Sequence, residues 1–121
     1  MMNFEKDDVI FSYSREQAIE DGVLVDVTET AKEAGFKIPV AITAGVHELC
    51  QPPKELEDCQ DYKGRLWDVL FMAAVAFRAK KDRIVPYKVI FAVTRSSKKT
   101  ETLWIVFNEA EGFTIMKPEE Y

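Results

Sequence analysis

The spacing of apolar residues changes along the chain, from a helical period to an extended one near the C-terminus. Between residues 61 and 81 apolar side chains recur every three or four positions, which predicts a helix. The stretch from Val69 to Phe77 has no polar residue on any face. A helix that is apolar all round is buried on most sides. We therefore expect 61–81 to be the central helix of the core.

Three shorter helices are predicted before this central helix. Ser14 opens a capping-box sequence, and Gly22 supplies the left-handed residue that ends the first short helix. The β-branched segment 23–27 predicts a short extended piece, and Gly35 ends the helix that follows it. A third short helix starts at Thr43 and must end before the next two prolines.

The C-terminal third is predicted to form strands. After Pro86 the pattern becomes extended, with apolar and β-branched runs at 87–94, 102–107 and 113–116 that are separated by turn-like stretches. The sequence therefore predicts one α+β domain over residues 1–121. In this fold the short N-terminal helices and one long central helix pack on a C-terminal three-stranded antiparallel sheet.

Composition and charge narrow the function classes. Hydrophobic residues make up 47% of the 121 positions and charged residues 31%, which is a globular balance. The formal net charge is −5, whereas general nucleic-acid binding needs clustered Lys and Arg. Two basic runs, at 78–83 and 95–99, are interpreted as solvated charge, with an anion-binding patch as the alternative. Direct nucleic-acid binding is therefore not expected.

No segment predicts export or membrane insertion. The longest apolar run, Val69 to Phe77, is far shorter than the ~20 residues that span a bilayer. The first eight residues are acidic, whereas a secretory signal begins with basic residues. Cys50 and Cys59 are accordingly expected to be free thiols. These observations predict a cytoplasmic protein with no membrane partner.

The sequence carries no familiar catalytic pattern. Glycine-rich phosphate loops, nucleophile elbows and HExxH helices are absent, so no catalytic residue, cofactor or metal ion is assigned. His47 is the only histidine and precedes Cys50 by three residues, on the same helical face. With Cys59 it could form part of a zinc site, or with Cys50 a nucleophilic pair. We favour a buried Cys50 with His47 at the edge of the core, and a protein that is not an enzyme.

Five residues are singled out as a tentative binding site. Asp68 begins the wholly apolar span, and Arg65 stands one turn before it. The two residues form either a structural ion pair or the polar part of a groove in which Trp67 is an aromatic wall. Tyr13 and Arg15 flank the start of the first helix, where anions can bind. Capping of that helix is the alternative explanation.

Several distinct motifs are spread over most of the chain. They are Phe11–Arg15, Gln17–Ile19, Asp21–Val27, Glu33–Phe36, Pro39–Ala41, Gly64–Leu70 and Thr114–Pro118. Together they resemble a family of small uncharacterised bacterial proteins, a domain of unknown function found on plasmids and other mobile elements. The resemblance implies a bacterial setting, and the family has no activity to transfer. The chain departs from the family pattern in the short connection between its last two predicted strands.

Two functions from different classes are consistent with these features. The first is a small acidic protein-binding or accessory protein of a mobile element, which could inhibit a host defence or nucleic-acid-processing system by covering a basic groove. The alternative is a small-ligand-binding protein or enzyme with a polar site around Arg15, Arg65 and Asp68. A C-terminal edge strand also offers a route to a homodimer.

Overall fold

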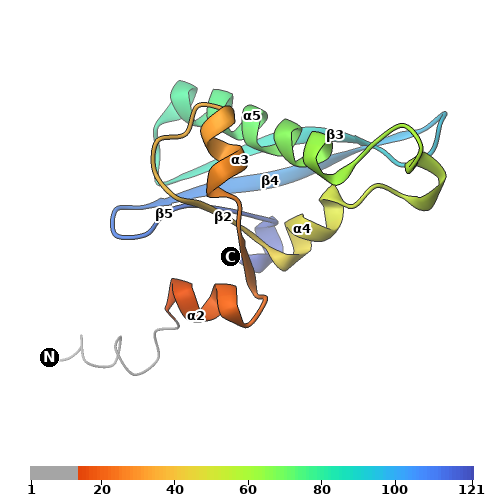
Figure 1. Cartoon of the computed structure of the whole chain (residues 1–121). Helices are drawn as coiled ribbons and strands as arrows, with labels where there is room; N and C mark the ends of the chain where they lie inside the picture. The colour runs from red at the N-terminus through yellow and green to blue at the C-terminus, as the bar shows by residue number, and fades with distance from the viewer. Residues whose placement is uncertain (1–13) are drawn as a thin grey trace, which may run out of the picture.

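A mixed β-sheet runs through the middle of the fold, with helices on both of its faces (Figure 1). The structure is a computed structural model and describes residues 14–121. In chain order the elements are α2 (Arg15–Glu20), β1 (Leu24–Asp26), α3 (Thr28–Glu33), β2 (Val40–Thr43), α4 (Ala44–Cys50), η1 (Lys54–Leu56), α5 (Tyr62–Lys80), β3 (Ile84–Ala92), β4 (Lys98–Asn108), β5 (Gly112–Met116) and η2 (Pro118–Glu120). Tyr13, one of the predicted binding residues, lies outside the described residues.

The sheet has five strands in the order β1-β2-β5-β4-β3. The three C-terminal strands pair antiparallel, as expected, but β1 and β2 from the first half of the chain extend the sheet. β2 lies parallel to β5, with Val40 opposite Phe113 and Ile42 opposite Ile115. The predicted three-stranded antiparallel sheet is therefore wrong in extent and in type. Because β5 is interior, the edge strands among residues 14–121 are β1 and β3, so the open edge in the C-terminal half of the chain is β3 and not the last strand.

The core lies between the sheet and the layer formed by α3, α4 and α5. Alternate strand residues face this layer, and Ile42, Leu103, Ile105 and Ile115 are completely buried against the likewise buried Leu70 of α5. Burial of each large apolar side chain stabilises the fold by roughly 1.5–3 kcal/mol before conformational entropy is subtracted. The second face of the sheet is contacted by α2 (Figure 1).

Helix α5 has the predicted extent but not the predicted burial. Asp61 caps its first turn and Lys81, at φ 56°, ends it, in agreement with the expected helix over 61–81. Its outer face, however, leaves Phe71, Met72 and Val75 exposed by 41%, 40% and 44%. The prediction that this helix is buried on most sides is thus wrong for one face. No helix among residues 14–121 combines the length and apolar character needed to cross a membrane.

Candidate functional site

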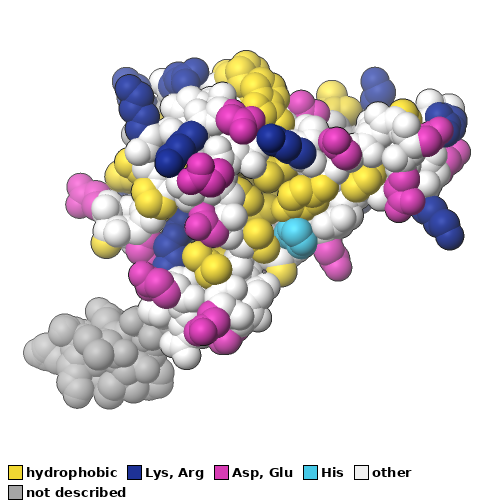
Figure 2. Space-filling model, in the orientation of Figure 1, with side chains coloured by type: hydrophobic (Ala, Val, Ile, Leu, Met, Phe, Trp, Pro, Cys, Tyr) yellow, Lys and Arg dark blue, Asp and Glu magenta, His cyan; other side chains and the backbone are white. Residues whose placement is uncertain are grey.

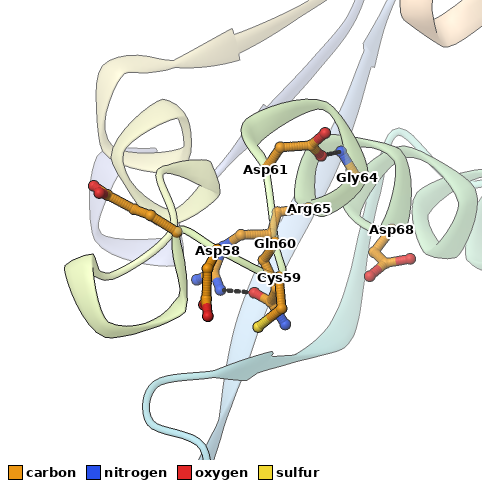
Figure 3. Close-up of a pocket in the computed structure, with 8 residues that line it drawn as sticks. Asp58, Cys59, Gln60, Asp61, Gly64, Arg65 and Asp68 are labelled. Atoms are coloured by element: carbon orange, nitrogen blue, oxygen red, sulfur yellow. Dashed lines mark hydrogen bonds between the residues drawn. The ribbon is translucent and has the colours of Figure 1, made fainter.

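Arg65, in the first turn of α5, is the one buried charged residue in the described part of the chain, with 8% exposure. Its Nε and Nη2 donate to the carbonyl of Leu49 at 3.2 and 3.0 Å. Its Nη1 donates to Gln60 Oε1 at 2.7 Å (Figure 3) and also to the carbonyl of Ala92 at 3.0 Å. Four of the five guanidinium N–H donors are therefore occupied. The side chain ties the end of α4, the loop before α5 and the end of β3 together.

The predicted ion pair between Arg65 and a neighbouring carboxylate is not formed within residues 14–121. Asp68 is exposed, and Figure 3 shows its carboxylate directed away from the guanidinium. Burial lowers the pKa of Arg65, while Cys50 and then Asp68 act in the opposite direction. The ring of Phe91 adds a cation–π contact, with its centroid 5.0 Å from the guanidinium carbon. Backbone carbonyls and an aromatic ring thus stabilise the positive charge of the Arg65 guanidinium.

A polar pocket of about 500 Å³ surrounds the exposed side of Arg65 (Figure 3). Its lining consists mainly of polar and acidic side chains, namely Glu57, Asp58, Cys59, Gln60, Asp61, Arg65 and Asp68, with Gly64. Asp58 is paired with Arg95 at 2.8 Å. Because the carboxylates outnumber the single lining cation, whose donors are mostly occupied, an anionic ligand finds little attraction here. The charge of the pocket therefore disfavours an anionic small ligand.

Arg15 lies elsewhere, on the second face of the sheet. It donates to Thr114 Oγ1 at 2.8 Å and to the carbonyl of Phe113, and Glu111 approaches it at 4.0 Å. Burial lowers the pKa of its guanidinium, with Glu111 as the largest opposing influence. Figure 1 places α2, which carries Arg15, across the sheet from α5, which carries Arg65. The structure therefore does not bring these two arginines into one site, and Arg15 anchors α2 to β5.

His47 and Cys50 also have structural partners. The Nδ1 atom of His47 is 2.6 Å from the hydroxyl of Tyr62, and Cys50 is completely buried. Burial raises the pKa of the Cys50 thiol to about 12 and that of Tyr62 to about 12. The residues described include no group of three His, Cys, Asp or Glu side chains arranged to hold a metal ion. Cys59 is exposed, and both thiols are free, as expected.

The two thiols are predicted to differ sharply in reactivity. The thiolate is the reactive form, so the raised pKa and burial of Cys50 should slow its alkylation by about 100-fold or more relative to exposed Cys59. Titration of the native protein with a thiol reagent should modify one group, and titration in denaturant should modify two. The variant Cys59→Ser should show no rapid reaction. Rapid modification of both thiols in the native protein would contradict this placement of Cys50.

The edge strand β3 presents an ordered row of outward backbone groups. The carbonyl of Arg83 accepts from the amide of Phe107 in β4 at 2.7 Å, and the amide of Val93 donates to the carbonyl of Ser97, just before β4, at 3.0 Å. In an antiparallel pair the bonding side alternates with each residue, and the register is uninterrupted between these two points. The even-numbered residues 84–92 therefore direct their N–H and C=O groups outward. Two positions in this row are special, because Pro86 has no N–H and the Ala92 carbonyl already accepts from Arg65.

Exposed apolar side chains lie beside this row. Ile90 on β3 is 62% exposed, and it shares a hollow of about 560 Å³ with Phe71 and Met72 of α5. Val75 lies one turn beyond Phe71 on the same helix. Figure 2 shows hydrophobic side chains gathered over α5 on the upper rim of the view. We call Phe71, Met72, Val75, Ile90 and the outward edge of β3 the α5–β3 surface.

Trp67 is the one predicted binding residue that adjoins the α5–β3 surface. Its ring stacks on Phe71, with centroids 4.9 Å apart and an interplanar angle of 11°. Trp67 does not line the polar pocket that Arg65 and Asp68 share. Sequence reasoning did not identify Ile90 or Met72 as exposed. The available signal was a helix with more apolar faces than one sheet can cover, followed by a proline directly before a predicted strand.

Comparisons with known proteins give a family and no activity. Neither a curated protein nor a solved structure matches the chain. The profile of a family of unknown function (DUF6573) matches residues 1–120. This match covers nearly the whole chain and agrees with the resemblance noted in its motifs, so the chain belongs to the DUF6573 family.

Proposed function

We propose that this chain is a protein-binding protein that docks its partner on the α5–β3 surface. The observation that carries the proposal is the exposure of Phe71, Met72, Val75 and Ile90, by 40–62%, beside the outward edge of β3. Exposed apolar side chains grouped on one element mark interaction sites, and an open strand edge recruits a further strand. A partner that covers this surface would also bury the apolar face of α5 that the sheet leaves exposed.

The net charge and the family resemblance extend this proposal. Away from this surface, the formal charge of −5 favours a further association with a basic protein surface, such as the groove of a nucleic-acid-processing protein. We accordingly place the chain in the bacterial cytoplasm, as an accessory protein of a mobile element that inhibits a host defence or nucleic-acid-processing system. The support for this setting is the resemblance of the motifs, together with the acidic charge.

Site-specific photo-crosslinking tests the proposed surface. A photo-reactive phenylalanine analogue at position 90 is compared with the same analogue at Val23, which is also exposed, at 49%, but lies next to β1. In bacterial cells we expect a discrete adduct from position 90 and none from position 23. Adducts of equal yield from both positions, or from position 23 alone, would refute the α5–β3 surface as the docking site.

The substitution Ile90→Lys is predicted to separate binding from folding. Because Ile90 is 62% exposed, the free energy of unfolding should change by only about 0.5 kcal/mol. A lysine on the strand edge opposes strand addition, so capture of the crosslinked partner should fall by about tenfold or more. Urea denaturation and quantitative capture measure the two effects, with Val23→Lys as the matched control. Unchanged capture by Ile90→Lys would contradict the proposal.

A further inference from the structure

We infer that the occupant of the α5–β3 surface is β3 of a second copy of this chain. The inference rests on the proposed function, since it names the partner of the same surface. The two β3 strands pair antiparallel across a two-fold axis at Val89, so that Lys88 of each copy lies opposite Ile90 of the other. The two five-stranded sheets then join into one continuous sheet of ten strands.

The backbone of β3 selects this register. In a hydrogen-bonded antiparallel pair each residue donates to, and accepts from, the residue opposite. With the axis at Val89, Pro86 lies opposite Ala92 of the second copy. The missing N–H of Pro86 then faces the one carbonyl that already accepts, at 3.0 Å, from Arg65. The Ala92 amide donates to the Pro86 carbonyl, so no group of the pair is left without a partner.

Shifting the register by two residues in either direction loses this match. With the axis at Lys88, two like charges lie opposite each other, and the missing donor of Pro86 faces the open carbonyl of Ile90. With the axis at Ile90, Pro86 lies opposite Thr94, so its missing N–H no longer faces the Ala92 carbonyl that Arg65 already satisfies. Each alternative leaves at least one poorly matched group at the junction.

The match is also a reason to choose a copy of the same chain over an unrelated strand. Pro86 and Ala92 lie at equal distances in sequence on either side of Val89. With a two-fold axis at that residue, Pro86 of each copy lies opposite Ala92 of the other, so the match occurs twice in the dimer. An unrelated strand has no need of this symmetry, whereas a self-complementary patch is what a two-fold interface requires.

The side chains that flank the strand supply the remaining interface. Phe71 and Met72 share one hollow with Lys88, Val89 and Ile90, so they stand level with the proposed axis. The axis consequently brings the exposed apolar residues of both α5 helices together over the junction. A specific interface buries about 1,000 Å² or more in total, and in this arrangement both strand edges and both sets of side chains contribute to it.

The other edge of the sheet offers no comparable surface. β1 has three residues against nine in β3. Val23 is the exposed large apolar residue next to β1. In contrast, β3 and α5 together carry Phe71, Met72, Val75 and Ile90. The second copy is therefore assigned to β3.

Sedimentation velocity on the full chain, over about 1–200 μM, tests the dimer in the range of a micromolar dissociation constant. We expect a concentration-dependent dimer for the wild type, and a dissociation constant raised by about tenfold or more in Ile90→Lys. Val23→Lys should match the wild type. A wild-type monomer at every concentration overturns the inference, and an adduct from position 90 to a different protein would then still uphold the proposed function.

Mixed disulfide formation tests the register. In a Cys59→Ser background, chains with Lys88→Cys and chains with Ile90→Cys are oxidised separately and then together. The Cα separation of a hydrogen-bonded antiparallel pair is within disulfide range, so we expect covalent dimers in the mixture and little in either sample alone. Self-crosslinking of Lys88→Cys chains or of Ile90→Cys chains would indicate an axis at that residue and overturn the proposed register.

Discussion

Replacing Arg65 with alanine is expected to lower the free energy of unfolding by about 3 kcal/mol. The substitution removes four hydrogen bonds and leaves the acceptors of Leu49, Gln60 and Ala92 without their donor. These acceptors belong to three different parts of the chain, so the loss also loosens α4 and the end of β3 from α5. Urea denaturation followed by circular dichroism measures the effect.

The matched control for this prediction is Arg95→Ala. Arg95 bonds the carboxylate of Asp58 at 2.8 Å, but both side chains are more than half exposed. Exposed ion pairs contribute about 0–1 kcal/mol, so the control should be nearly neutral. Arg65→Lys should recover only a small part of the loss, because an ammonium cannot reach all three acceptors from one position. Equal destabilisation by Arg65→Ala and Arg95→Ala would refute the structural role assigned to Arg65.

The substitution Gly112→Ala is predicted to have a comparable effect, of about 3 kcal/mol or more. Gly112 begins β5 at φ 103°, a conformation that L-residues rarely adopt, and an added Cβ would collide with the carbonyl oxygen of Pro39. That carbonyl accepts from the Phe113 amide at 2.9 Å, next to the parallel pairing of β2 with β5. Relief of the collision would therefore disturb the junction between the two halves of the sheet.

Gly22→Ala separates the two causes of this loss. Gly22 also has a positive φ, 81°, but an added Cβ meets no atom within 4 Å. The change should cost only the conformational strain, about 1 kcal/mol. Thermal or urea unfolding of the two variants gives the comparison. If both variants lose the same amount, the close approach of Pro39 contributes nothing.

Local signals in the sequence were sufficient to predict the ends of several elements. Ser14 caps α2 by accepting from the amide of Gln17 at 3.0 Å, and Asp61 and Lys81 bound α5. Such caps depend on residues within one turn of each other, so the sequence displays them directly. The three C-terminal strands were predicted for a similar reason, since neighbouring strands are joined by short turns.

The parallel strand β2 could not be predicted in the same way. Its four residues, Val40–Thr43, form a short apolar run whose period does not distinguish a strand from a helix. Its neighbour β5 begins at Gly112, about 70 residues later. Such a pairing depends on packing of the whole domain and has no local signature. The expected three-stranded sheet was the part of the sheet that local turns specify.

The role of Arg65 and the exposure of α5 were missed for related reasons. A sequence shows which carboxylates are near Arg65 in a helix, but its actual acceptors come from Leu49, Gln60 and Ala92. The apolar pattern of α5 shows that its faces favour burial, but it does not say whether this chain or another provides the cover. Phe71 and Val75 remain exposed because the sheet and the short helices cover one side only.

The central claim is that the outward edge of β3 pairs with β3 of a second copy, and amide hydrogen exchange tests it most directly. At low concentration the outward amides of Lys88, Ile90 and Ala92 should exchange quickly, whereas the amides bonded to β4 are protected. At high concentration the account predicts that these three amides slow by about tenfold or more as the second strand pairs. Equally fast exchange of all three at both concentrations, with the amides bonded to β4 protected throughout, would contradict the account.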